Sequence, residues 1–86
     1  MFRSPREIGG LVRELRLERE LTQADLAERA GVSREWLLAF ERGKPNVDLA
    51  RVLDVLTALG MTLDVVPDDR DSASDDLLRR LLGGAP

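Results

Sequence analysis

The run LTQADLAERAGVSREWLLAFERGK, residues 21–44, constrains the fold most, because it contains start and stop signals for two short helices. Thr22 is a suitable N-cap for the first helix, and Asp25 suits its positively polarised amino end. Gly31 follows the last helical position, where the backbone commonly turns left-handed. The pattern predicts a helix over about residues 23–30.

The same signals repeat a few residues later. Ser33 can cap a second helix that continues through Phe40 and stops at Gly43. A linker this short makes two helices cross steeply, as in a helix-turn-helix, which lays its second helix in a major groove of DNA. A plain helical hairpin is the alternative interpretation.

Composition limits what else the chain can do. Its 86 residues make one small domain, and they include no cysteine and no histidine. Disulfide frameworks, Cys/His zinc sites, thiol nucleophiles and histidine-based triads are therefore excluded. We expect no catalysis, no cofactor and no bound metal.

The charge is unevenly distributed along the chain. The formal net charge is −3, yet residues 1–44 hold nine Lys/Arg and eight Asp/Glu, whereas residues 45–86 hold four and eight. A local basic footprint matters more for DNA binding than the total charge. The candidates for that footprint are Arg13, Arg16, Arg34, Arg42 and Lys44.

Neither a signal peptide nor a membrane span is predicted. The amino terminus lacks the positive-then-apolar signal pattern, and no apolar run approaches the roughly 20 residues that a span needs. We expect a cytoplasmic protein with no membrane partner.

Another helix is predicted before the run. Ser4 can cap it, followed by proline at the first helical position and by Glu7. Apolar residues then recur on one face as far as about Arg19: Ile8, Leu11, Val12 and Leu15. Gly9 and Gly10 interrupt this pattern, and they either permit close helix packing or fray the helix.

A fourth helix is predicted after the run. Asn46 can cap it and Gly60 ends it. Its apolar positions, Leu49, Val52, Leu53, Leu56 and Leu59, are expected to join one core shared by four helices. The four predicted helices together make up the expected DNA-binding domain, residues 1–60.

Residues 61–66 alternate apolar and polar side chains before Pro67, which predicts a strand. Its members are Met61, Thr62, Leu63, Asp64, Val65 and Val66. A lone strand has no edge to bond within the molecule, and the simplest partner is its own copy. We therefore expect antiparallel pairing across a symmetric homodimer, with an extended tail of the core as the alternative.

Residues 67–86 are predicted to be an acidic flexible tail. Their first half is rich in Asp and Ser, and it lacks the glycine and terminal glutamate of a calcium loop. Ser74 can cap a short helix that carries Leu77, Leu78, Leu81 and Leu82. These leucines either fray in solvent or dock on a partner.

Ten residues together resemble the Xre/Cro family of phage-repressor-like DNA-binding domains: Gln23, Leu26, Ala27, Ala30, Gly31, Val32, Ser33, Leu37, Glu41 and Gly43. The resemblance covers about residues 6–60. It implies an all-α fold, four helices with a possible short C-terminal one, in a lambda-repressor-like helix-turn-helix domain. The strand after the fourth helix, the Phe40–Glu41 pair and the short length resemble HipB-type antitoxins more narrowly.

The candidate DNA contacts are Gln23, Ser33, Arg34, Glu35, Trp36, Ala39, Arg42 and Lys44. Gln23 matches a glutamine that bonds a backbone phosphate, or else it is only an exposed helix starter. Arg42 and Lys44 are either phosphate contacts or solvated charges.

Three positions fall where the family reads base edges: Arg34, Glu35 and Ala39. Arg34 can bond guanine in a bidentate manner, and Glu35 can accept from a cytosine amine or repel phosphates. Both are also ordinary surface residue types. Trp36 departs from the family, which has a small polar residue there, and it either extends the core or lies against sugar and phosphate.

Arg16 and Glu41 match a family ion pair that joins the first helix to the end of the third. If this pair is partly buried, removal of one partner leaves a charge uncompensated. We therefore expect a structural role for both residues.

The predicted function is that of a dimeric, sequence-specific repressor bound to double-stranded DNA at a palindromic operator. If the HipB resemblance holds, the chain is the antitoxin of a type II toxin–antitoxin operon, which it autoregulates, and it neutralises a HipA-like Ser/Thr kinase toxin. The alternatives are a stand-alone phage-type or controller regulator without a toxin, and a protein-binding adaptor of the same fold.

Overall fold

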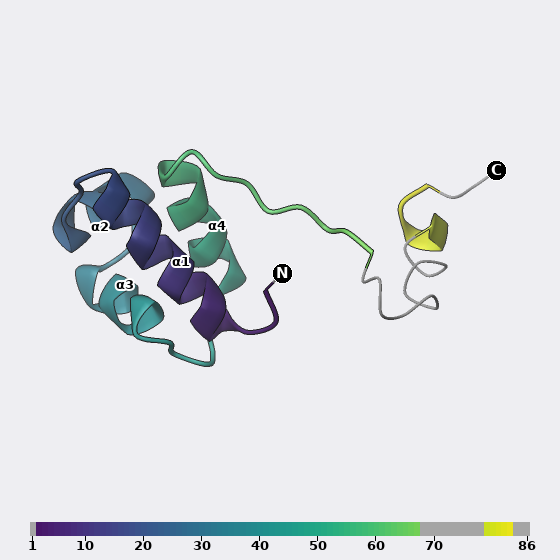
Figure 1. The fold of residues 1–86 in the computed structure, drawn as a ribbon, viewed down its shortest axis with the longest axis horizontal. Coiled ribbons are helices and arrows are strands. Elements are labelled where there is room, and N and C mark those ends of the chain that lie inside the picture. Colours follow the sequence, from purple (N-terminus) through teal and green to yellow (C-terminus); the bar gives the residue numbers. More distant parts are fainter. Residues whose placement is uncertain (1, 68–78, 84–86) are drawn as a thin grey trace.

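The computed structural model describes residues 2–67 and 79–83. In that part of the chain four helices form the fold: α1 (Pro5–Glu18), α2 (Gln23–Ala30), α3 (Arg34–Glu41) and α4 (Leu49–Ala58). Figure 1 shows them gathered into one bundle. The all-α prediction is confirmed for these residues, and none of the helices among them is long and apolar enough to cross a membrane.

Three helices begin at the N-caps that the sequence predicts. The Ser4 hydroxyl accepts from the backbone N–H of Glu7 at the start of α1, and Ser33 caps α3 in the same way. Thr22 and Asp25 form a full capping box at α2, in which each side chain accepts from the other's backbone N–H at 3.0 Å. Local hydrogen bonding therefore determines where these helices start.

The predicted cap of α4 is wrong. Asp48, not Asn46, caps this helix, because its Oδ1 accepts from the backbone N–H of Ala50 at 2.9 Å. Its other oxygen lies 3.0 Å from an Arg51 nitrogen. Both residue types can cap a helix, and the path of the loop after α3 selects the later one.

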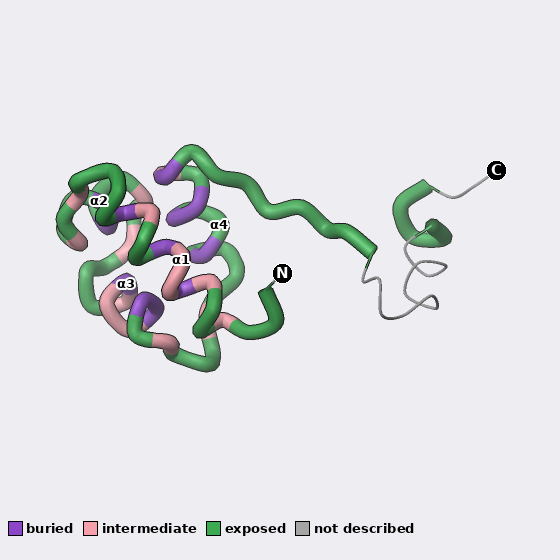
Figure 2. The backbone as a smooth tube through the Cα atoms, viewed as in Figure 1, coloured by how far each residue is buried: buried purple, intermediate pink, exposed green. Residues whose placement is uncertain are grey.

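The core lies where α3 packs against α1 and α2, and α2 packs against α4. Figure 2 shows the buried positions along the inner sides of these helices. The buried apolar residues are Val12, Leu26, Ala27, Leu37, Phe40, Val52, Val55, Leu56 and Leu59. The prediction that Leu49 and Leu53 join this core is wrong, since they are 63% and 40% exposed at the edge of the apolar stripe of α4.

Gly9 permits a close approach of α1 to α3. A Cβ atom at this position would lie 2.1 Å from the Phe40 carbonyl oxygen, far inside van der Waals contact. Gly10 has no such neighbour within 4 Å. Of the two interpretations left open for this pair, Gly9 is explained by close packing.

Residues 61–67 form no strand in the described chain. In Figure 1 they leave α4 as an extended trace that runs away from the bundle. Met61, Leu63, Val65 and Val66 are exposed. The predicted strand is therefore corrected to an extended segment, because a single chain offers no second strand for its backbone to pair with.

The proposed docking leucines lie partly outside the described residues. This applies to Leu77 and Leu78, together with the rest of residues 68–78. Leu81 and Leu82 are described, and each is 70% exposed. Their docking role stays a prediction.

Candidate nucleic-acid interface

The turn between α2 and α3 sets the geometry of the candidate interface. Gly31 has a φ of 72°, in the left-handed region, and ends α2. The Val32 N–H returns to the Ala27 carbonyl at 3.0 Å, which closes the end of the helix. Ser33 then caps α3, so only residues 31–33 separate the end of α2 from the start of α3. This is the short, sharp connection of a helix-turn-helix.

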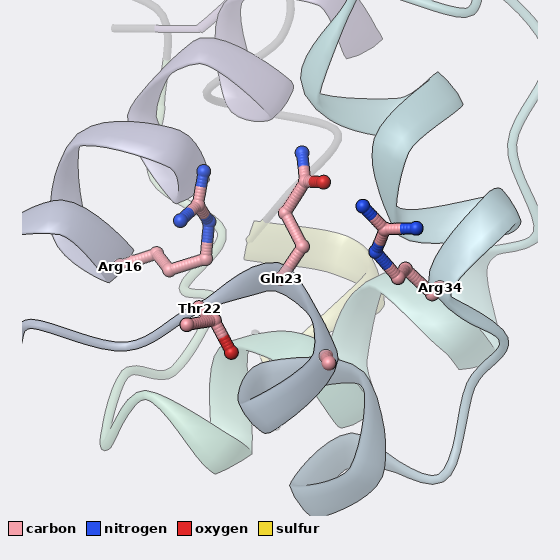
Figure 3. Close-up of a pocket in the computed structure, with 5 residues that line it drawn as sticks. Arg16, Thr22, Gln23 and Arg34 are labelled. Atoms are coloured by element: carbon pink, nitrogen blue, oxygen red, sulfur yellow. The ribbon is translucent and has the colours of Figure 1, made fainter.

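An open hollow lies beside this turn. It is lined by Arg16 from the last turns of α1, by Thr22, Gln23 and Ala24 at the start of α2, and by Arg34 at the start of α3. In Figure 3 the Gln23 side chain stands between the guanidinium groups of the two arginines. Backbone N–H groups at a helix start and arginine side chains both favour an anion.

Arg16 and Glu41 form the ion pair that the family resemblance implies. Arg16 Nε lies 2.8 Å from Glu41 Oε2, and Nη2 lies 2.9 Å from Oε1. Their side chains are 9% and 2% exposed. The hydrogen bond to Glu41 raises the pKa of Arg16, as does the charge of that carboxylate, against the opposing effect of burial. This pair is a bidentate, charge-assisted contact between α1 and the end of α3.

Two further hydrogen bonds connect this ion pair to the start of α2. Arg16 Nη1 donates to the Leu21 carbonyl at 2.9 Å, and Gln23 Nε2 donates to Glu41 Oε1 at 3.4 Å. Sequence reasoning missed both contacts. Gln23 and Glu41 are 18 residues apart, and no local pattern connects them.

Most of the predicted DNA contacts lie on the surface around α3. Residues Ser33, Arg34, Glu35, Arg42 and Lys44 are exposed, whereas Gln23 and Ala39 are half-buried. The Ser33 hydroxyl already accepts from the Trp36 N–H at 3.0 Å, so its observed role is to cap the helix. The structure thus brings Gln23 and Arg34 to one hollow and leaves the others on the face of α3 and in the loop after it.

Trp36 packs onto the core. Its ring centroid lies 5.1 Å from that of Phe40, one helical turn later, and the two planes are inclined by 33°. The indole is only half-buried. Of the two alternatives for Trp36, the ring contact favours an extension of the core that keeps one edge at the surface.

The sequence and the fold match known proteins. A family model described as a helix-turn-helix domain matches residues 7–73. An HTH-type transcriptional regulator of Sinorhizobium fredii (strain NBRC 101917 / NGR234), uncharacterized and named y4mF, is 41% identical over 70 residues. The match covers 80% of this chain and 92% of that protein.

Two solved structures share the fold. The restriction-modification controller protein C.AhdI from Aeromonas hydrophila superposes with a TM-score of 0.62 at 37% identity, over 66% of this chain and 86% of that one. HipB in a complex with an O2 20mer gives a TM-score of 0.73 at 23% identity, over 80% and 94%, and at that identity it shows the fold alone. Together with the family model, these likenesses show that the chain belongs to the helix-turn-helix domain family, as an Xre-like member.

Proposed function

We propose that the chain is a sequence-specific, DNA-binding transcriptional regulator that inserts α3 into a major groove. The observation that carries this proposal is the hollow at the start of α2 and α3, where Gln23 and Arg34 meet beside the exposed first turn of α3. A helix-turn-helix reads bases with the amino-terminal residues of its second helix. The similarity to HTH-type regulators supports the same function.

Phosphate contacts position the protein on the duplex in this proposal. Gln23 bonds one phosphate at the amino end of α2, and Arg42 and Lys44 bond the backbone beyond α3. Both cationic side chains are exposed and come directly after α3, the helix proposed to enter the groove. They supply affinity for any sequence, because phosphates carry no base identity.

Base contacts come from Arg34, Glu35 and Ala39 of α3. Arg34 is exposed at the first helical position, where a bidentate bond to guanine contributes about 1–3 kcal/mol of discrimination. Glu35 accepts from a cytosine amine, and the methyl group of Ala39 contacts a thymine methyl group. Trp36 supports this surface from the core side.

We further propose that two copies bind one palindromic operator as a homodimer. The extended segment 61–66 exposes Leu63 and Val65 by 42% and 67%. Leu63 also lines an apolar groove with Ile8, Val47 and Val52. Antiparallel pairing of this segment with its copy gives the backbone its missing partner and covers these side chains.

Two biological settings fit such a regulator. An autoregulating antitoxin that neutralises a HipA-like kinase is supported by the resemblance of the Phe40–Glu41 pair and the short chain to HipB-type antitoxins. A stand-alone controller is supported by the higher identity to C.AhdI. Co-purification with the product of the neighbouring gene separates the two settings, because a bound kinase-like partner supports the antitoxin. The affinity for that partner is then measured after deletion of residues 74–86. An unchanged affinity removes the docking role of Leu77, Leu78, Leu81 and Leu82.

The central experiment selects an operator from a random-sequence duplex library with the full chain. Affinity for the selected operator and for random DNA is then measured at several salt concentrations. We expect affinity to fall steeply with salt, because each neutralised phosphate releases counterions. A flat salt dependence, with equal affinity for both duplexes, contradicts the proposal and favours a protein-binding adaptor.

Three variants assign the roles in this assay. Arg34→Ala should lose operator affinity and little random-DNA affinity, whereas Lys44→Ala should weaken both to a similar degree. Arg51→Ala is the matched control, because it removes the same charge from α4, outside the helix-turn-helix, where Arg51 pairs with Asp48. Identical behaviour of the first two variants contradicts the assigned roles.

A further inference from the structure

Glu41 occupies an unusual position in the candidate interface. It is one partner of the buried ion pair, and it also contacts Gln23, a proposed DNA contact. One of its oxygens accepts from Arg16 alone, while Oε1 accepts from Arg16 at 2.9 Å and from Gln23 at 3.4 Å. Its side chain is 2% exposed. The ion pair therefore borders the hollow through the Arg16 side chain, and its carboxylate contacts Gln23 there.

The carboxylate itself is held in one orientation. Two bonds from the Arg16 guanidinium engage both of its oxygens, and the third nitrogen of that guanidinium is bound to the Leu21 carbonyl. A planar guanidinium that bonds a carboxylate at two points leaves it little freedom to rotate. Glu41 Oε1 is thus a fixed acceptor beneath the hollow.

A fixed acceptor orients an amide. A carboxylate only accepts hydrogen bonds, so the amide nitrogen of Gln23 must face Glu41, and the amide oxygen must point away from it. Figure 3 shows the Gln23 side chain between Arg16 and Arg34, whose guanidinium groups are donors. With one N–H directed to Glu41, the second N–H of Gln23 is left for a phosphate oxygen, and its carbonyl oxygen is left for Arg34.

We propose that Glu41 is a positioning residue for DNA binding, which holds the Gln23 amide in the orientation that bonds phosphate. The inference rests on the proposed function and adds a second role to the ion pair. Arg16 and Glu41 stabilise the packing of α1 on α3, and the same carboxylate prepares the surface for the duplex. Its loss lowers DNA affinity even in protein that is fully folded.

The test is a double-mutant cycle in operator affinity, measured with Gln23→Ala, Glu41→Gln and the double variant. Binding is measured where circular dichroism shows every variant to be folded. We expect Glu41→Gln to weaken binding about tenfold when Gln23 is present, roughly the effect of one hydrogen bond to a charged group. The same substitution in the Gln23→Ala background should change affinity less than about twofold, because the contact it controls is already lost.

A core substitution serves as the control for lost stability. Val12→Ala removes buried methyl groups from α1 and has no contact with Gln23 in the described hydrogen-bond network. It should lower the melting temperature and leave the affinity of the folded protein unchanged. An equal loss from Glu41→Gln in both backgrounds, no loss in either, or a tenfold loss from Val12→Ala overturns the proposal.

A measurement without DNA distinguishes this inference from the proposed function. In the free wild-type protein the Gln23 side-chain amide should give a rigid ¹⁵N relaxation signature, which becomes flexible in Glu41→Gln. A flexible amide in the wild type overturns the positioning role even if DNA binding is strong. A rigid amide in a protein that binds no duplex contradicts the proposed function instead.

Discussion

The helical unit, α1 to α4, and the extended segment 61–66 are both rich in apolar residues, but only the helical unit buries them. In the helices, residues such as Leu26, Leu37 and Phe40 are fully buried. In the segment, Leu63 and Val65 are exposed. A helix satisfies its backbone within itself and needs only a face to pack on, whereas a strand needs the backbone of another strand. The first region therefore buries its apolar side chains within one chain, whereas the second leaves its apolar side chains exposed.

The largest expected effect lies in the buried ion pair, which holds the helical unit together. Glu41→Ala leaves the Arg16 charge buried and uncompensated, and we expect a loss of about 3–5 kcal/mol in the free energy of unfolding. Urea unfolding measures it. Glu35→Ala, on the exposed face of the same helix, should change the value by less than about 0.5 kcal/mol. Equal midpoints for the two variants contradict a structural role for the pair.

The adjacent glycines of α1 provide the next test. Gly9→Ala places a methyl group against the Phe40 carbonyl, and moving α1 away from α3 should cost about 1–3 kcal/mol. Gly10→Ala meets open space and should stabilise the protein by up to about 1 kcal/mol through helix propensity. Thermal unfolding of the two variants measures both. The same sign for both changes contradicts the close contact at Gly9.

Features of the fold that depend on neighbouring residues could be predicted from the sequence. The bounds of α2 and the caps Ser4, Thr22 and Ser33 follow from local signals, since a cap depends on residues two or three positions away. The choice of Asp48 over Asn46 does not, because both can cap and the loop path decides between them. The exposure of Leu49 likewise depends on which edge of α4 meets α2.

The sequence indicated which residues belong to the candidate site, but it did not indicate the hydrogen bonds that join them. The ion pair followed from a family resemblance, because its partners are 25 residues apart. The bond between Gln23 and Glu41 depends on three helices meeting, and no spacing in the sequence encodes it. For residues 61–66 the alternation predicted a strand, but the described residues form only an extended segment, because an alternating pattern does not supply a second strand to pair with.

Segment 61–66 can be tested for a role in dimerisation without disturbing the helices. Val65→Asp should change the free energy of unfolding by less than about 0.5 kcal/mol at concentrations where the wild type sediments as a monomer, because Val65 is exposed. At higher concentration it should abolish the proposed homodimer, as a buried carboxylate opposes pairing. Unchanged sedimentation removes the segment from the interface. A large loss of stability in the monomer shows instead that it belongs to the helical unit.

The smallest expected effect is the acid sensitivity of the capping box. Hydrogen bonds from Thr22, first from its backbone and then from its side chain, lower the pKa of Asp25 below its ordinary value. A carboxyl with a lowered folded pKa stabilises the protein above its unfolded pKa, about 3.9 for Asp, and the contribution is lost as pH falls through the folded pKa. Asp25→Asn should therefore reduce the difference in stability between pH 6 and pH 3, measured by urea unfolding.

This effect is small because Asp25 is exposed, and water and salt screen a surface carboxylate. The same variant can therefore be used to compare the local capping box with the long-range ion pair. The capping box depends only on residues 22–25, so its loss should shift stability without changing the Arg16–Glu41 contact. Asp25→Asn and Glu41→Ala should then be additive. A pH dependence that is the same in Asp25→Asn and wild type shows that the folded and unfolded pKa values of Asp25 do not differ. Strong coupling between the two variants shows that the start of α2 and the ion pair fold as one unit, through the Gln23 bond that joins them.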